Sequence, residues 1–163
     1  DLGCAPGSWL LYAAELTGKN GRVVGIDLKP VSGRLPSNAK AFIGDIYEID
    51  AAMQAAMREG FHVVLSDMAP STTGHARTDK IRIMNLAENA AYFAIEVLAP
   101  QGAFVCKLFQ GGAEKELLTM LKQNFQTVKH AKPKASRADS SESYIVATGF
   151  RSRKSEKGSG LGA

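Results

Sequence analysis

The sequence predicts an α/β domain built on a doubly wound, mostly parallel sheet. Short apolar runs rich in β-branched residues recur along the chain, and segments with the apolar spacing of a helix separate most of them. Most of the runs are continuously apolar rather than alternating, which is typical of parallel strands covered on both faces. The chain has 163 residues, which is enough for one domain with a sizeable core.

Six segments carry the strand pattern. They are RVVGIDL (22–28), AKAFIGD (39–45), FHVVLSD (61–67), GAFVCKLF (102–109), QTVKHAKP (126–133) and SYIVATGF (143–150). The last two are joined by a polar loop with no helical pattern, so we expect them to form an antiparallel hairpin at one edge of the sheet.

Between the strands, four segments place apolar residues at helical spacing. They contain Trp9, Leu10, Ala13 and Leu16; Met53, Ala56 and Met57; Ile83, Leu86, Ala90, Phe93 and Val97; and Leu117, Leu118 and Leu121. Strands that alternate with helices in this way predict a sheet wound on both sides.

The two ends of the chain lie outside this alternation. The opening DLGCAPG reads as the end of a strand that runs into a glycine-rich turn, so we expect the first strand to be largely missing. The closing RSRKSEKGSGLGA is almost free of apolar residues and cannot offset the entropy cost of ordering itself. We therefore expect one domain over 1–150, incomplete at its N-terminus, and a disordered basic tail over 151–163.

The charge balance and the cysteines limit the classes of function. Lysine and arginine number 20 against 16 acidic residues, which fits a polyanionic partner, although charge alone fits a solvated basic face almost as well. The only cysteines, Cys4 and Cys106, are far apart and in no metal-ligand spacing, so we expect neither a disulfide nor a metal site. No run approaches the roughly 20 apolar residues of a membrane span, so we expect a cytoplasmic protein that does not bind membranes.

Residues that carry chemistry gather at the predicted strand ends. In open parallel sheets ligands bind beyond the carboxyl ends of the strands, so these positions are the ones that can meet in a site. The set consists of two glycines, three aspartates and a lysine, which are Gly3, Gly7, Asp27, Asp45, Asp67 and Lys107.

Three of these features indicate a nucleoside ligand. Asp27 ends its strand where a carboxylate can accept hydrogen bonds from ribose hydroxyls, a device shared by nicotinamide and adenosyl ligands. The turn G-C-A-P-G lacks the third glycine of a dinucleotide site, which disfavours a nicotinamide-dependent oxidoreductase and leaves a purely structural turn as the alternative. Asp45 could accept from an adenine amino group or, with equal weight, cap the helix that follows.

Asp67 and Lys107, further along the chain, are charged residues in or next to apolar strands. Burying a charge is costly, so a functional role is the simplest reason for their positions. Asp67 follows an apolar strand, and Lys107 lies within one, although it could also be an exposed charge at a strand end. A lysine beside an aspartate can serve chemistry on a weakly acidic hydroxyl. Burial lowers its pKa and the carboxylate raises it, so the balance decides whether the amine can take a proton. Glu142 opens the last strand and could reach such a lysine.

Taken together, the motifs resemble the FtsJ/RrmJ family of 2′-O-ribose methyltransferases over residues 1 to about 150. The motifs are DLGCAPGSW, GIDLKP, GD at 44–45, SDMAPSTTG, VLAPQGAFVCKLFQG and KPKASRADSSESYIVATGF. The resemblance implies a Rossmann-like class I fold, S-adenosylmethionine as cofactor and an RNA ribose as substrate. The SDMAP form with a following TG is similar to members that methylate a uridine of large-subunit (23S-type) ribosomal RNA. A tRNA methyltransferase and a non-catalytic RNA-binding protein on the same scaffold are the alternatives.

The resemblance also implies roles for individual residues. Of the family's catalytic set Lys-Asp-Lys-Glu, the last three match Asp67, Lys107 and Glu142, and the first lysine lies upstream of the residues present here. Lys107 would be the base, Asp67 would orient it and Glu142 would hold it. The cofactor would be bound by Gly3, Ala5, Pro6, Gly7, Trp9, Asp27, Leu28, Asp45, Ile46 and Asp67. RNA phosphates of the large ribosomal subunit would meet Lys29, Arg77, Lys80, Lys132, Lys134 and Arg137 of a monomeric protein that uses no metal.

Overall fold

The computed structural model describes residues 1–71, 73–109, 114–134 and 142–152, and the structural statements below concern these residues. The strands are β1 (Val23–Asp27), β2 (Ala39–Ile43), β3 (Phe61–Ser66), β4 (Leu98–Phe109), β5 (Phe125–Ala131) and β6 (Glu142–Phe150). The helices are α1 (Ser8–Thr17), α2 (Ala51–Met57), α3 (Ala76–Val97) and α4 (Lys115–Asn124). All six predicted strands and four predicted helices are therefore present, with small shifts at their ends.

The strands form a mixed sheet in two parts that meet at Leu2. β1 pairs with β2 and β3 pairs with β4, both in parallel, whereas β6 pairs antiparallel with β4 on one side and with β5 on the other. Leu2 bridges to Ile26 of β1 and to Ser66 of β3, and its N–H donates to the Leu65 carbonyl at 2.8 Å. The strand order is thus β2-β1-Leu2-β3-β4-β6-β5, and the predicted antiparallel edge hairpin is confirmed.

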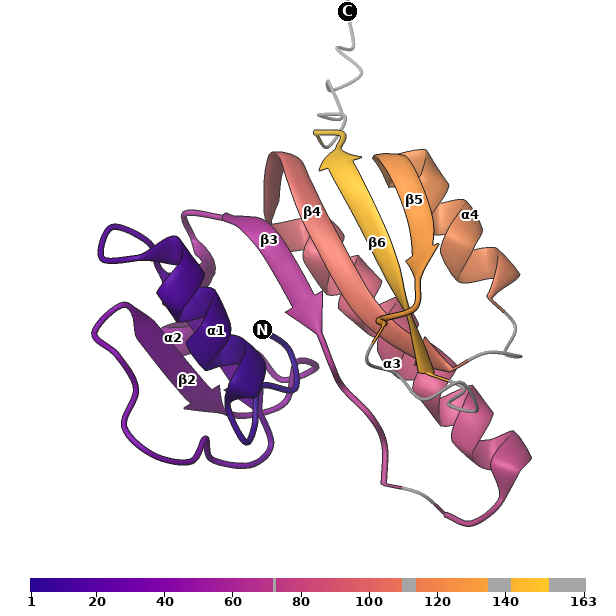
Figure 1. Cartoon of the computed structure of the whole chain (residues 1–163), viewed down its shortest axis with the longest axis horizontal. Coiled ribbons are helices and arrows are strands. Elements are labelled where there is room, and N and C mark those ends of the chain that lie inside the picture. The colour runs from indigo at the N-terminus through magenta and orange to yellow at the C-terminus, as the bar shows by residue number, and fades with distance from the viewer. Residues whose placement is uncertain (72, 110–113, 135–141, 153–163) are drawn as a thin grey trace, which may run out of the picture.

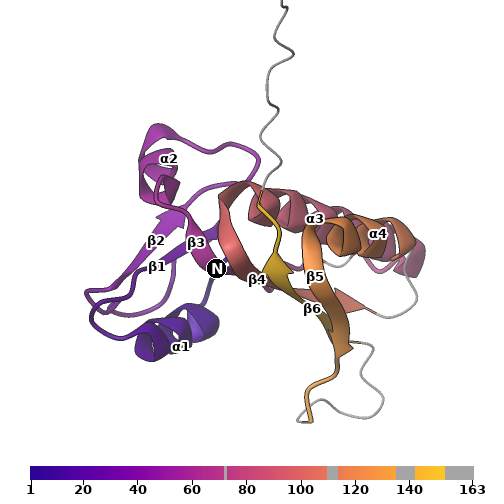
Figure 2. The same ribbon diagram turned by 90° about the horizontal axis from the view of Figure 1, so that it is seen from above.

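The helices cover the two faces of the sheet unequally. Figure 2 shows α3 and α4 on one face of the β3-β4-β6-β5 part, and α1 on the other side of the sheet next to β1 and β2. The side chains under α3 and α4 are fully buried, among them Phe104, Leu108 and Ile145. On β6, buried positions alternate with half-buried ones. Tyr144 is one of the half-buried residues of β6, and Lys107, its partner on β4, is half-buried as well. The face of β4 and β6 that α3 and α4 leave open is therefore where polar groups can act (Figure 1).

The buried stripe of α3 differs from the predicted one. It consists of Met84, Ala87, Ala90, Ala91 and Ala94. Of the predicted set only Ala90 is fully buried, and the larger residues, Ile83, Leu86, Phe93 and Val97, lie partly buried along the flanks. Alanines at the centre of the contact let the helix axis approach the sheet closely, because packed interiors leave no room for long side chains there.

The predicted apolar stripe of α1 also needs correction at its end. Leu10 and Ala14 are buried, whereas Leu16 is 69% exposed. The helix packs mainly on β1 and β2, and the Leu16 side chain in its last turn lies outside this contact. None of the helices in the described part of the chain is long and apolar enough to cross a membrane.

The start of α2 settles one of the two interpretations of Asp45. The N-cap of α2 is Asp50, whose side chain accepts a hydrogen bond from the Met53 N–H at 2.8 Å. Asp45 lies five residues earlier and instead accepts from the Tyr47 N–H at 3.0 Å, so it does not cap the helix.

Replacing Asp50 with alanine is expected to lower the free energy of unfolding by about 1 kcal/mol, because the first turn of α2 loses the acceptor for an otherwise unpaired N–H. Urea denaturation followed by circular dichroism measures this change. Gln54→Ala, at an exposed position of the same helix, is the matched control, and an equal effect of both substitutions would argue against the cap.

Candidate active site

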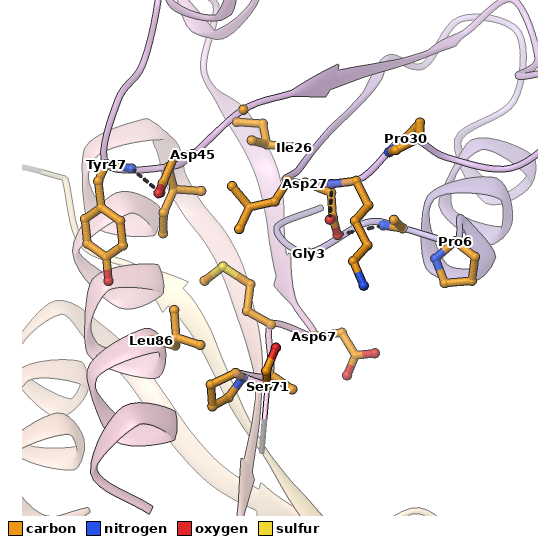
Figure 3. A pocket seen from close by; sticks show the side chains of 18 of the residues that line it. Gly3, Pro6, Ile26, Asp27, Pro30, Asp45, Tyr47, Asp67, Ser71 and Leu86 are labelled. Atoms are coloured by element: carbon orange, nitrogen blue, oxygen red, sulfur yellow. Dashed lines mark hydrogen bonds between the residues drawn. The ribbon is translucent and has the colours of Figure 1, made fainter. Parts of the chain in front are cut away.

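A cavity of about 870 Å³ lies at the carboxyl ends of β1, β2 and β3. Eight of the ten predicted cofactor residues line it, which are Gly3, Ala5, Pro6, Asp27, Leu28, Asp45, Ile46 and Asp67. Figure 3 shows Asp27 and Asp45 on one side of the cavity and Asp67, Ser71 and Leu86 on the other. The structure does not bring Gly7 and Trp9 into the lining, because Gly7 is buried at the start of α1 and Trp9 packs against Tyr144.

Asp27 fixes the glycine turn against the end of β1. Its two carboxylate oxygens accept the N–H of Ala5 at 2.9 Å and the N–H of Lys29 at 2.8 Å, as the dashed lines in Figure 3 show. Each oxygen keeps a second lone pair that can accept from a ligand hydroxyl. The carboxylate is therefore held in a defined orientation at the cavity wall before any ligand binds.

Gly3 lets this turn approach the segment after β3. Its φ is +76°, and a Cβ there would lie 2.9 Å from the Met68 side chain and 3.0 Å from the Met68 backbone. A side chain at this position would be strained and would collide with a neighbouring backbone. The glycine turn and the loop after β3 therefore lie in close contact at the wall of the cavity.

Lys107 forms ion pairs with both predicted acidic partners. Its Nζ lies 2.7 Å from Asp67 Oδ1 and 3.8 Å from Glu142 Oε1. The pairing of β3 with β4 places Ser66 beside Cys106, so the next residues, Asp67 and Lys107, are neighbours. The structure thus brings together all three predicted catalytic residues. The Lys107 side chain is 13% exposed and Asp67 is 33% exposed, so the pair is partly shielded from water.

The protonation state of Lys107 follows from this arrangement. Burial lowers the pKa of Lys107, but the hydrogen bond and charge of Asp67, together with the charge of Glu142, outweigh burial and raise the pKa above its ordinary value of 10.5. The sequence could not show whether burial or the carboxylates have the larger effect on the pKa of Lys107, and in the structure the carboxylates do. In the protein without ligands the side chain is an ammonium at neutral pH, and it must release a proton before it can act as a base.

One aromatic residue beside this cluster, Tyr144, was missed from the sequence. Tyr144 pairs with Lys107 across β4 and β6, and its ring lies 5.7 Å from that of Trp9, centroid to centroid. The signal was available in the motif SESY, because alternation along a strand places Tyr144 on the same face as Glu142. Trp9, predicted to hold the cofactor, packs against Tyr144 and does not line the cavity.

The predicted RNA-binding residues lie in three places. Lys29 lines the cavity, Arg77 and Lys80 are exposed in the first turns of α3, and Lys132 and Lys134 are exposed just after β5. Arg137 lies outside the described residues. Within the described ranges, no group of three or more histidine, cysteine, aspartate or glutamate residues could hold a metal ion.

A mixed α/β sheet with acidic strand ends around one cavity and a paired lysine beside it defines a Rossmann-like class I methyltransferase fold, as the sequence predicted. The chain belongs to the FtsJ-like methyltransferase family, whose model matches residues 1–150.

Its relatives in sequence share a name. Proteins called ribosomal RNA large subunit methyltransferase E from Desulforapulum autotrophicum and Acidiphilium cryptum are 49% and 52% identical to it over 149 and 158 residues. These matches cover 91% and 93% of this chain, and 73% and 66% of the relatives. A third, from Paramagnetospirillum magneticum, is 50% identical over 93% of this chain, which spans 64% of that relative.

Solved structures show the same fold. A ribosomal RNA methyltransferase from Plasmodium falciparum superposes with a TM-score of 0.79 at 27% identity, covering 94% of this chain and 86% of the other. Human methyltransferase-like protein 13, solved with S-adenosylhomocysteine, gives a TM-score of 0.62 at 14% identity, covering 94% and 71%. The second likeness concerns the fold alone.

Proposed function

We propose that the protein transfers a methyl group from S-adenosylmethionine to the 2′-hydroxyl of a ribose, a uridine, in large-subunit ribosomal RNA. The observation that carries the proposal is the position of Asp67, which lines the cavity and also contacts Lys107 at 2.7 Å. One carboxylate thereby links a nucleoside-sized cavity to an amine that can handle a hydroxyl proton. The named substrate of the relatives supports ribosomal RNA as the acceptor.

The cavity fits the cofactor by the chemistry of its walls. S-Adenosylmethionine supplies a methyl group carried on a positively charged sulfonium. Asp27, already oriented by two backbone N–H groups, would accept from the ribose hydroxyls, and Asp45 would accept from the adenine amino group. Gly3 has no side chain, so the backbone of the glycine turn would lie close to the methionine part of the cofactor.

Lys107, oriented by Asp67 and Glu142, would remove the proton of the acceptor hydroxyl. The ribose 2′-oxygen forms its new bond to the methyl carbon as the carbon–sulfur bond breaks, and the hydroxyl proton must leave. A neutral Lys107 amine would take that proton, while Asp67 and Glu142 orient the amine. The pKa of Lys107 should fall when a positively charged ligand enters the cavity, because like charges disfavour the ammonium.

The RNA would reach this site through contacts with its phosphates. Lys29, Arg77, Lys80, Lys132 and Lys134 would supply them, so binding should weaken steeply as salt rises. Because the relatives are named for a ribosomal substrate, we place the reaction on the large ribosomal subunit in the cytoplasm.

The proposed function is tested by methyl transfer to purified ribosomal particles. Large subunits from cells that lack the corresponding gene are incubated with the protein and labelled S-adenosylmethionine, and the product is mapped by resistance to alkaline cleavage and by mass spectrometry. We expect one new 2′-O-methyl ribose in large-subunit RNA. Methylation of tRNA alone, or of a base instead of a ribose, would refute the assignment.

Replacing Asp27 with alanine is expected to weaken S-adenosylmethionine binding about 10- to 100-fold, because a charged acceptor for the ribose hydroxyls is lost. Isothermal titration calorimetry gives the dissociation constant directly. Asp50→Ala removes a carboxylate that does not line the cavity and serves as the matched control. An unchanged dissociation constant in the Asp27 variant would remove the ribose assignment.

A further inference from the structure

Trp9 and Tyr144 form an aromatic pair next to the Lys107 cluster. Trp9 lies in the first turn of α1 and Tyr144 in the middle of β6, and their ring planes are tilted by 33° at a centroid distance of 5.7 Å. Tyr144 is the cross-strand partner of Lys107, and directly opposite residues place their Cβ atoms about 5 Å apart. The pair therefore borders the amine on the open face of the sheet.

The pair does not serve as core. The larger apolar cluster lies between the sheet and α3 and α4, and the smaller one packs Leu10 and Ala14 of α1 against β1; neither includes Trp9 or Tyr144. Both side chains are half-buried, so each keeps part of its surface open to solvent. Large aromatic side chains that add nothing to a core are typical of binding surfaces.

The electrostatics of Tyr144 tie it to the same site. Burial raises the pKa of the phenol and the carboxylates of Asp67 and Glu142 raise it further, against the opposing effect of Lys107. The ring therefore remains neutral at physiological pH and above. A neutral aromatic surface beside a charged cluster offers apolar contact to one part of a ligand while the charges meet another part.

We propose that Trp9 and Tyr144 form a stacking platform for an unpaired nucleobase of the RNA substrate, which places the attached ribose at Lys107. This inference rests on the proposed function and deepens it. A base has a flat π-face that stacks on tyrosine or tryptophan whatever its sequence, and single-stranded RNA is commonly held in this way. Tyr144 is then a positioning residue, because it touches the base and not the reacting oxygen.

The chain provides its own reporter for this contact. Trp9 is the only tryptophan in the sequence, so the intrinsic indole fluorescence reports on one side of the platform. We would titrate the protein with a short single-stranded uridine oligonucleotide and with an abasic oligonucleotide of the same length and phosphate number. Saturable quenching by the uridine oligonucleotide alone is expected, and equal quenching by both would overturn the platform.

Substitutions at Tyr144 separate stacking from packing. Tyr144→Phe keeps the ring and should bind the uridine oligonucleotide as the unaltered protein does. Tyr144→Leu keeps apolar bulk without the ring and should bind it about tenfold or more weakly. Tyr92→Leu makes the same chemical change at an exposed position of α3, where no effect is expected. Equal affinity in the Tyr144→Leu and Tyr92→Leu variants would overturn the proposal.

Methyl transfer distinguishes this inference from the proposed function. Tyr144→Leu should raise KM for the RNA or lower kcat, with the dissociation constant for S-adenosylmethionine unchanged. If the unaltered protein transfers no methyl group to RNA but base-dependent quenching persists, the proposed function fails and the platform stands. If Tyr144→Leu methylates with normal kcat/KM, the platform fails and the function stands. Should Tyr144→Leu not fold, the comparison of uridine and abasic oligonucleotides on the unaltered protein still decides.

Discussion

Replacing Lys107 with alanine is expected to lower kcat for methyl transfer by a factor of about 10² to 10⁴, the usual contribution of a positioned general base. The amine lies 2.7 Å from Asp67 and 3.8 Å from Glu142, and within the described residues no other lysine or arginine forms a salt bridge with Asp67. The substitution leaves Asp67 without its cation, but the carboxylate is 33% exposed and can be hydrated. We therefore expect a folded, inactive protein.

Single-turnover methylation of large ribosomal subunits measures the chemical step, and calorimetry with S-adenosylmethionine shows whether the cavity is intact. Lys107 does not line the cavity, so the dissociation constant should change little. Lys122→Ala removes an exposed lysine of α4 and is the matched control. Turnover within a few-fold of normal in the Lys107 variant would reject Lys107 as the base.

The strand-end residues could be predicted from the sequence because they depend on a simple geometry. Parallel strands end at one edge, so an aspartate that follows each apolar run has to lie near its neighbours, and Asp27, Asp45 and Asp67 all line the cavity. The face of α3 could not be predicted as well. Helical spacing identifies an apolar sector, but it does not show that Ala87 and Ala94 lie at its centre and Leu86 on its flank.

Other questions that the sequence left open could be decided only from distances in the folded structure. Asp45 and Asp50 both precede α2, and only the position of the Met53 N–H shows that Asp50 is the cap. The position of Trp9 depends on how far the start of α1 lies from β6, which no local pattern contains. Likewise, the opposing effects on the pKa of Lys107 could be named in advance, but their sum depends on the 2.7 Å contact with Asp67.

The rate of methyl transfer is expected to rise with pH above neutrality, because the raised pKa of Lys107 leaves only a small fraction of neutral amine. Well below its pKa, that fraction grows tenfold for each pH unit, so kcat/KM should increase about a hundredfold between pH 7 and pH 9. Loss of folded protein does not contribute to the rate change between pH 7 and pH 9. A raised pKa in the folded state means that the contribution of Lys107 to stability is complete below 10.5 and is lost only as pH rises through the folded value.

Asp67→Asn tests the origin of this pH dependence. The substitution keeps the shape of the side chain and removes the charge that holds the proton on Lys107, so the pKa of the amine should fall and the rising limb should move to lower pH. Initial rates between pH 6 and pH 9 give the rising part of the rate–pH profile for the unaltered protein and for the variant. S-Adenosylmethionine binding is measured at each pH. A profile that is flat in the unaltered protein, or unshifted in the variant, would mean that the hydroxyl proton does not pass through Lys107.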